Sequence, residues 1–363
     1  MQEVKLNIIP LKEWLNFPER PLIISGPCSA ENKEQVLQTA KKLAKTGIVN
    51  VFRAGIWKPR TRPDAFEGVG EAGLPWLSEV KEKTGLPVCV EVATPQHVEA
   101  AIKNEIDILW LGARTTANPF SVQEIAEALK GYDIPVMIKN PVTPDLKLWI
   151  GAIERINKSK INKIIAIHRG FTSYENTVYR NAPIWEIPIE LMRICPELPV
   201  ICDPSHITGN SMLLESVCQK ALDLEMDGMM IETHVNPKKA LSDAKQQITP
   251  DELVQLISKL IIRSNYTENT EFTNKLIELR SEIDNIDVEL IHLISKRMKI
   301  IEDIGKFKKE NNITILQIRR WNDVVRESIE LGEELGLNRE FLLKLLRVIH
   351  EESIQKQTDI FKK

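Results

Sequence analysis

The sequence predicts an α/β protein: a closed (β/α)8 barrel followed by a small all-α domain of three helices. Three observations support this prediction. Short apolar runs rich in β-branched residues recur along residues 1–263. Segments with helical periodicity separate these runs. After Arg263 the pattern changes to one long helical segment with a single glycine and no proline.

The apolar runs are predicted to be the strands of a parallel sheet. They lie at residues 22–24, 49–52, 88–92, 108–111, 136–138, 164–167, 200–202 and 229–231. Nearly continuous apolar runs, without alternating polar residues, are typical of strands buried on both faces.

Segments with helical periodicity follow nearly every run. The clearest lie at residues 33–45, 96–103, 121–129, 145–156 and 212–224. Eight such strand–helix units over about 250 residues are typical of a closed barrel. An open doubly wound sheet is the alternative, but no run is followed by its Gly-x-Gly-x-x-Gly turn.

The domain boundary is predicted from the change in pattern. Residues 1–263 would form the barrel, polar residues 264–271 a linker, and residues 272–363 the helical domain. Its first helix, to about residue 309, carries a 4-3 apolar spacing that indicates a coiled-coil-like seam. Two further helices are expected near residues 317–335 and 338–357.

The composition limits the class of protein. The chain has 363 residues and a net charge of −3, with acidic and basic residues mixed throughout. A nucleic-acid-binding protein would concentrate its basic charge, and no apolar run is long enough to span a membrane. The five cysteines show no paired spacing, which is typical of reduced thiols. We therefore expect a cytoplasmic enzyme without nucleic-acid or membrane partners.

Four potential metal ligands lie at the ends of neighbouring predicted strands. Cys28 follows the first strand, His206 follows the seventh, Glu232 ends the eighth, and Asp243 lies in the loop after it. In a barrel the carboxyl ends of the strands form the catalytic face. A thiolate, an imidazole and two carboxylates suit a divalent transition metal such as Mn²⁺, Fe²⁺, Co²⁺ or Zn²⁺.

A second group of strand-end residues is cationic. Its members are Arg53, Lys58, Arg60, Arg114, Lys139 and Arg169. So much positive charge in one cleft would repel itself without anionic ligands, and arginine matches the geometry of phosphate and carboxylate groups. The site is therefore expected to bind at least one phosphate and one carboxylate.

Seven short motifs stand at these strand ends. They are Gly26-Pro27-Cys28-Ser29, Arg53-Ala54-Gly55-Ile56-Trp57-Lys58-Pro59-Arg60-Thr61, Gly112-Ala113-Arg114-Thr115, Lys139-Asn140, His168-Arg169-Gly170, Asp203-Pro204-Ser205-His206 and Ile231-Glu232-Thr233-His234. In this order they resemble the motifs of class I 3-deoxy-D-arabino-heptulosonate 7-phosphate (DAHP) synthases, most closely the I-beta branch. The resemblance covers about residues 20 to 263.

The resemblance implies a role for each site residue. Cys28, His206, Glu232 and Asp243 would hold the metal, with Mn²⁺ as the first choice. The phosphoenolpyruvate site would contain Arg53, Lys58, Arg114, Lys139, Arg169 and His206. Arg60 and Thr61 would bind the phosphate of erythrose 4-phosphate, with Lys58, Cys28 and His206 as catalytic residues. The metal would polarise the aldehyde as a Lewis acid while C3 of phosphoenolpyruvate attacks it.

Two alternatives exist for the function of the barrel. The 3-deoxy-octulosonate 8-phosphate synthases share the barrel and phosphoenolpyruvate, but the Lys-Pro-Arg-Thr sequence at residues 58–61 favours the heptulosonate enzymes. A Schiff-base aldolase would use a lysine, with Lys139 as the candidate. The Cys/His/Glu/Asp set argues against that chemistry.

The long helix of the tail contains a charged residue within its apolar seam. Arg297 stands where the 4-3 spacing requires an apolar side chain, and Lys308 faces the same way at about 100° per residue. A buried charge needs a partner. Either a carboxylate of another helix or an anionic ligand held between helices would provide one.

The tail also has a characteristic spacing of polar residues. Its elements are Leu279-Arg280, Asp287, Arg297, Gly305-x-x-Lys308 and Glu351-x-Ser353-x-x-x-Gln357. Over about residues 272–360 it resembles the all-α chorismate mutases. The resemblance implies that Arg280, Arg297 and Arg320 bind the carboxylates of chorismate, and that Lys308 and Gln357 are catalytic residues at its ether oxygen. Arg280 would come from a second subunit.

The tail departs from that family at two positions. Gln317 and Trp321 replace an acidic residue and a glutamate, and the glutamate ordinarily contacts the substrate hydroxyl. The reading is therefore a bifunctional shikimate-pathway enzyme, with bare chorismate or prephenate binding, or a dimerisation module alone, as alternatives for the tail. We expect a homodimer through the helical domain, or a tetramer if the barrel adds an interface. Prephenate or chorismate is expected to inhibit the synthase allosterically.

Overall fold

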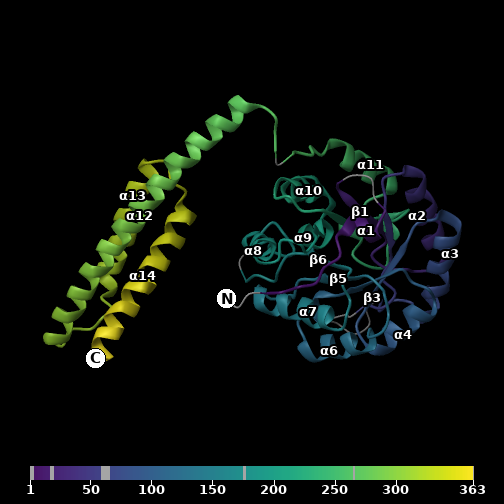
Figure 1. The fold of residues 1–363 in the computed structure, drawn as a ribbon, viewed down its shortest axis with the longest axis horizontal. Helices are drawn as coiled ribbons and strands as arrows, with labels where there is room; N and C mark the ends of the chain where they lie inside the picture. Colours follow the sequence, from purple (N-terminus) through teal and green to yellow (C-terminus); the bar gives the residue numbers. More distant parts are fainter. Residues whose placement is uncertain (1–3, 17–19, 59–65, 175–176, 265, 363) are drawn as a thin grey trace. The chain divides into compact units, whose positions relative to one another are not determined.

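The structure is a computed structural model that describes the chain except for residues 1–3, 17–19, 59–65, 175–176, 265 and 363. The chain divides into two compact units, Met1–Asn265 and Tyr266–Lys363 (Figure 1). No helix among the described residues carries an apolar stretch of the length and character needed to cross a membrane.

The first unit is a closed parallel barrel, as the apolar runs predict. In chain order its strands are β1 (Leu22–Gly26), β2 (Val51–Arg53), β3 (Val88–Val92), β4 (Ile108–Leu111), β5 (Val136–Lys139), β6 (Ile164–His168), β7 (Val200–Cys202) and β8 (Gly228–Glu232). Each strand pairs with the next, and β1 closes on β8 from Leu22 opposite Gly228 to Gly26 opposite Glu232. The predicted barrel is thus confirmed, and the doubly wound alternative is wrong.

Helices surround the barrel. They are α2 (Lys33–Thr46), α3 (Leu74–Thr84), α4 (Pro95–Lys103), α6 (Pro119–Ala128), α7 (Leu146–Lys158), α8 (Glu186–Ile194), α10 (Leu214–Asp223) and α11 (Pro250–Lys259). A short helix, α1 (Leu11–Trp14), precedes β1. Several begin with an Asn, Thr or Asp cap followed by proline, as at Thr94 before α4 and Asn118 before α6.

The strands are buried on both faces because alternate side chains enter two separate cores. In β1, Ile23 packs outward in the core between strands and helices. Leu22 and Ile24 point inward and pack with residues such as Trp110 in the barrel interior. Leu11 of α1 joins this inner core. The period-two alternation explains why both faces of each strand must be apolar.

The second unit consists of three helices. They are α12 (Thr270–Glu310), α13 (Ile318–Glu334) and α14 (Arg339–Lys362), and α14 packs along both others. α12 begins two residues before the expected residue 272 because Asn269 caps it through the backbone N–H of Phe272. A Cβ at Gly305 would lie 3.2 Å from Cγ of Gln357, so glycine permits the close approach of α12 to α14.

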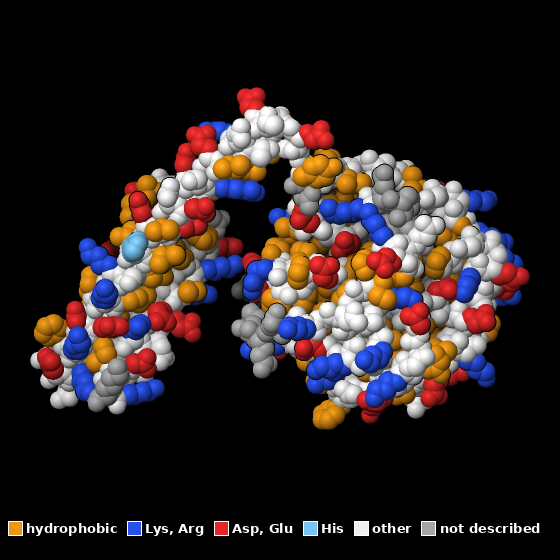
Figure 2. Space-filling model, viewed as in Figure 1, with side chains coloured by type: hydrophobic (Ala, Val, Ile, Leu, Met, Phe, Trp, Pro, Cys, Tyr) orange, Lys and Arg blue, Asp and Glu red, His pale blue; other side chains and the backbone are white. Residues whose placement is uncertain are grey.

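The apolar seam of α12 is not covered by the other two helices of its unit. Its members are Leu279, Ile283, Ile286, Leu290, Leu293, Ile300, Ile304 and Phe307, which are all exposed. Gly305 is the one residue of α12 that is buried among those described. Apolar side chains are visible along this unit in Figure 2. Exposed apolar rows of this size usually mark an interface.

Candidate active site

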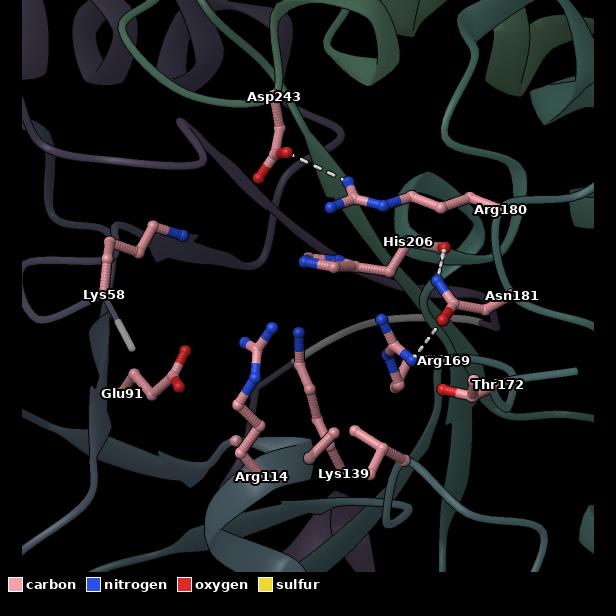
Figure 3. Close-up of a pocket in the computed structure, with 13 residues that line it drawn as sticks. Lys58, Glu91, Arg114, Lys139, Arg169, Thr172, Arg180, Asn181, His206 and Asp243 are labelled. Carbon is pink, nitrogen blue, oxygen red and sulfur yellow. Dashed lines mark hydrogen bonds and ion pairs between the residues drawn. The ribbon is translucent and has the colours of Figure 1, made fainter. Parts of the chain in front are cut away.

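The carboxyl ends of the barrel strands surround a cationic cavity of about 330 Å³. Its polar lining includes Lys58, Glu91, Arg114, Lys139, Arg169, Thr172, Arg180, Asn181, His206 and Asp243. Figure 3 shows the cationic side chains and His206 directed toward a common space. The barrel therefore brings together residues that lie far apart in the sequence, at the face where barrel enzymes carry their chemistry.

Cys28 lies just after β1 and is fully buried. Its Sγ donates to Oδ2 of Asp243 over 3.3 Å, and Nζ of Lys58 lies 3.1 Å from the same sulfur. A Cβ at Gly55 would come within 2.6 Å of the Cys28 carbonyl oxygen, so glycine is required there. Burial raises the pKa of the Cys28 thiol to about 11, and the Glu232 carboxylate adds to this effect.

The Asp-Pro-Ser-His motif forms the start of the short helix α9 (Pro204–Thr208). Asp203 is the N-cap and accepts the backbone N–H of His206 over 3.0 Å, while Pro204 takes the first helical position. Nδ1 of His206 lies 2.8 Å from the Asp203 carboxylate, which fixes the ring. Ser205 Oγ accepts the backbone N–H of Glu232. One local motif therefore positions two candidate ligands.

Glu232 ends β8 and is fully buried between several partners. Its Oε1 lies 3.1 Å from NH1 of Arg53 and 3.7 Å from Nε2 of His206. Burial alone would raise the pKa of Glu232, but His206, Arg53 and Lys58 outweigh it and lower that pKa. The carboxylate is therefore ionised at neutral pH.

Two adjacent glutamines that the sequence analysis missed organise the loop after β8. Gln246 donates to Oε2 of Glu232 over 2.7 Å and accepts from NH1 of Arg180 over 2.8 Å. The same guanidinium contacts Oδ1 of Asp243 at 2.9 Å. Gln247 accepts the backbone N–H of Cys28. Gln246 and Gln247 lie outside the seven motifs, and nothing in their spacing reveals these contacts.

The cations at the ends of β5 and β6 are held by buried partners. Nζ of Lys139 lies 2.7 Å from Oδ2 of Asp203, and both side chains are buried. NH1 of Arg169 donates to Oδ1 of Asn181 over 2.7 Å. Burial lowers the pKa of Arg169 to about 10, and the nearby cations Arg180 and Arg114 act in the same direction. The arrangement is preorganised for anions.

The predicted phosphate-binding residues of the strand-two loop cannot be placed. Arg60 and Thr61 lie outside the described residues. Arg114, on the short helix α5 (Ala113–Thr116), does line the cavity.

The four predicted metal ligands stand as two pairs, Cys28 with Asp243 and Glu232 with His206. Within the part of the chain that the structure describes, no three His, Cys, Asp or Glu side chains form a ready-made metal cluster. The chemistry of the donors nevertheless fits a transition metal. His206 and Asp243 line the cavity and contact the buried Glu232 and Cys28, so soft sulfur, imidazole nitrogen and carboxylate oxygen lie close together.

In the helical unit, α12 and α14 bring together three of the predicted mutase residues: Arg297, Lys308 and Gln357. NH1 of Arg297 donates to Oγ of Ser353 over 2.6 Å. Nζ of Lys308 donates to the carbonyl oxygen of Ile315 over 2.6 Å. Gln357 is buried, and its Oε1 has no partner among the described residues. Burial lowers the pKa of both Arg297 and Lys308.

Arg280 cannot join this cluster in the same chain. It lies on α12 at a distance of about 25 Å from Arg297 along the helix axis, given a rise of about 1.5 Å per residue. Arg280 and Arg320 are both exposed. The predicted pocket is therefore incomplete within one chain.

A stacked aromatic pair lies beside the cluster. The rings of Trp321 on α13 and His350 on α14 are 3.7 Å apart between centroids and 12° from parallel. Burial lowers the pKa of His350, and the charges of Arg297 and Lys308 lower it further. Trp321 stands out in the sequence as a departure from the family, whereas His350 belongs to no sequence motif.

Comparison with known proteins assigns each unit to a family. Residues 18–268 match the DAHP synthetase I family, and residues 279–358 match the family described as chorismate mutase type II. The phospho-2-dehydro-3-deoxyheptonate aldolase of Thermotoga maritima is 34% identical over 241 residues, which cover 66% of this chain and 69% of that protein. A 2-dehydro-3-deoxyphosphooctonate aldolase of a Geobacter species is 30% identical over 263 residues, covering 66% and 91%.

Solved structures agree with the barrel assignment. The crystal structure of the Thermotoga maritima aldolase, also named DAHP synthase, has a TM-score of 0.59 and 30% identity, covering 66% of this chain and 67% of that one. A truncated form of the 3-deoxy-D-arabino-heptulosonate 7-phosphate synthase of the same organism has a TM-score of 0.57 and 29% identity, covering 66% and 84%.

Proposed function

The chain belongs to the DAHP synthetase I family, and from this premise we propose which of its residues bind the substrates, hold the metal and regulate the reaction. Together with the chorismate mutase domain, this membership makes the protein a bifunctional shikimate-pathway enzyme. Its barrel is a DAHP synthase, and its helical unit is a chorismate mutase.

Phosphoenolpyruvate binds in the cationic cavity of the barrel. The observation that carries this proposal is the convergence of Lys58, Arg114, Lys139, Arg169 and Arg180 on one space of about 330 Å³. The phosphate and carboxylate of phosphoenolpyruvate neutralise these charges, and preorganised donors need no rearrangement during the reaction. Arg53 does not line this space; its guanidinium is buried against Glu232 and the Cys28 carbonyl oxygen and adds positive charge to the site. Arg60 and Thr61 bind the phosphate of erythrose 4-phosphate.

A divalent metal is held by Cys28, His206, Glu232 and Asp243. Class I DAHP synthases are generally metal-dependent, and Mn²⁺ is our first choice here. When bound, the metal supplies Lewis-acid polarisation of the aldehyde. Neighbouring side chains position the proposed ligands. Asp203 holds the His206 ring, Gln246 holds Glu232, and Lys58 lies beside both the Cys28 sulfur and the cavity.

The first test is consumption of phosphoenolpyruvate with erythrose 4-phosphate, with and without EDTA. We expect EDTA to abolish turnover and Mn²⁺ to restore it. Arabinose 5-phosphate serves as the control substrate and should react poorly. Full turnover in EDTA would overturn the metal proposal, and preferential turnover of arabinose 5-phosphate would overturn the substrate assignment.

The mutase site is completed by a second copy of the chain. Arg297 and Arg320 bind carboxylates of chorismate, Lys308 and Gln357 contact its ether oxygen, and Arg280 enters from the partner. The exposed apolar row of α12 supports a dimer through this unit. The Arg280→Ala and Arg297→Ala proteins should each be inactive as mutases, but mixing equal amounts should restore about a quarter of the activity. After random exchange half of the dimers are mixed, and each mixed dimer has one intact site of two. No recovery after subunit exchange would place Arg280 outside the site.

The helical unit also senses prephenate or chorismate and inhibits the barrel. The fusion of an early and a later pathway step in one chain supports this proposal. Prephenate should inhibit the synthase of the unchanged protein, and Arg297→Met should weaken that inhibition while leaving uninhibited synthase turnover intact. Equal inhibition of both proteins would refute a role for the mutase site in sensing.

The five free, buried cysteines support a reducing, cytoplasmic setting.

A further inference from the structure

The Trp321–His350 pair presents an imidazole to the mutase cluster. His350, Ser353 and Gln357 follow one another on α14 at i, i+3 and i+7, so they share one face of that helix. Ser353 and Gln357 face α12, because Ser353 accepts a hydrogen bond from Arg297 and Gln357 packs on Gly305. His350 therefore points toward the same space, with Trp321 stacked on it from α13.

The groups around this space are rich in donors and poor in acceptors. Arg297 and Lys308 can only donate hydrogen bonds. Oγ of Ser353 gives its proton to the Ile349 carbonyl oxygen. Two acceptors are left: Oε1 of Gln357, which is buried without a partner, and the imidazole of His350. Among the residues that the structure describes, no hydrogen-bond partner meets either ring nitrogen of His350.

The imidazole is held in its neutral form by its surroundings. Burial lowers the pKa of His350, and the cations Arg297 and Lys308 lower it further. A neutral imidazole carries one acceptor nitrogen and one donor N–H. It can therefore accept a hydrogen bond from a hydroxyl group, which neither a protonated histidine nor the surrounding cations could do.

We infer that His350 is a substrate-binding residue of the mutase site and accepts a hydrogen bond from the ring hydroxyl of chorismate. Trp321 positions the imidazole by stacking on it. The pair thus takes the place of the glutamate that the family ordinarily has at position 321. This inference rests on the mutase function proposed above, because it assigns the hydroxyl of that substrate to a residue of this chain.

The test compares chorismate with its 4-deoxy analogue, which lacks the hydroxyl. In the unchanged full-length protein, kcat/KM should favour chorismate by roughly three- to tenfold, as one neutral hydrogen bond allows. His350→Phe keeps an aromatic ring for Trp321 but removes the acceptor, so it should lose this preference. His350→Gln restores an acceptor and should recover part of it. Circular dichroism checks that both variants keep their helices.

Two outcomes separate this inference from the mutase assignment. If His350→Phe keeps the full preference for chorismate, the role of His350 is overturned while the mutase stands. If the unchanged protein turns over neither compound, the mutase activity fails. Calorimetric Kd values for the two compounds then decide the inference: a preference for the hydroxyl that disappears in His350→Phe supports it, and equal preferences in both proteins overturn it.

Discussion

Arg53 and Glu232 form an ion pair of 3.1 Å in which both side chains are almost completely buried. Arg53 ends β2 and Glu232 ends β8, so the pair bridges two strands that flank β1. The guanidinium also lies over the Trp110 ring at 4.8 Å. The pair thus holds a buried cation next to the carboxylate of the proposed metal site.

Breaking this pair should destabilise the barrel. Arg53→Met removes from the buried Glu232 the cation of its shortest ion pair, and such a loss costs about 3–5 kcal/mol. Urea unfolding followed by tryptophan fluorescence would measure it. The control is Lys259→Met, which removes an exposed pair with Glu215 and should cost about 0–1 kcal/mol. Equal losses in the two variants would mean that the buried pair contributes no more than a surface one.

Cys28 should be required for metal binding. Cys28→Ala removes the only sulfur among the four proposed ligands, so Mn²⁺ affinity should fall by more than the roughly 10–100-fold typical of outer-shell changes. Metal content after dialysis against Mn²⁺ and elemental analysis would show this. Cys195→Ala, which alters a buried thiol after α8, should keep its metal. A fully loaded Cys28→Ala protein would contradict the proposed ligand.

Gln246 should raise the metal affinity by holding Glu232 and Arg180 in place. Gln246→Met keeps the side-chain length but leaves Oε2 of Glu232 and the Arg180 guanidinium without this bridge. We expect metal affinity to fall roughly 10–100-fold, as when other partners of metal ligands are removed. An isothermal titration with Mn²⁺ measures the change. Gln255→Met, on the exposed surface of α11, should have no effect; a similar loss there would point to general destabilisation.

The apolar row of α12 should hold two chains together. Leu290→Glu in the full-length protein places a charge on a side chain that is half exposed in the single chain. Burial of one such leucine is worth about 1.5–3 kcal/mol, so the dimer should dissociate at micromolar concentration. Light scattering after gel filtration gives the mass. Phe120→Glu, at an exposed position on the barrel, is the control and should leave the mass unchanged.

Stability of the barrel should fall as the pH drops from about 6.5 to 5. Burial lowers the pKa of His168 in the folded protein to about 3, and the charge of Arg169 lowers it further. Below about pH 6.5, therefore, the unfolded chain binds a proton at this histidine that the folded state does not bind. Protonation therefore favours unfolding, by up to about 1.4 kcal/mol per pH unit in this range. His168→Phe should flatten the dependence of unfolding free energy on pH. His206, whose pKa is also lowered by burial, should leave a residual slope. An unchanged slope would contradict the assignment.

The site was only partly visible in the sequence. Strand-end positions identified Cys28, His206 and Glu232, because chain order fixes which residue follows each strand. Arg180 and Gln246 escaped notice, because they lie within loops whose path no periodicity specifies. No motif pointed to His350 for a related reason: its stacking on Trp321, from which we inferred its role, depends on how α13 and α14 pack.

The sequence by itself determined the barrel, the three-helix tail and the family of each. Hydrophobic periodicity is a local property, and the order of the strand-end motifs follows from the chain. Only the tertiary structure decided which charges share a cavity, that Gln246 bridges Glu232 and Arg180, and that α13 and α14 leave the seam of α12 uncovered. These relationships join residues separated by tens to hundreds of positions, and their distances depend on how strands and helices pack together.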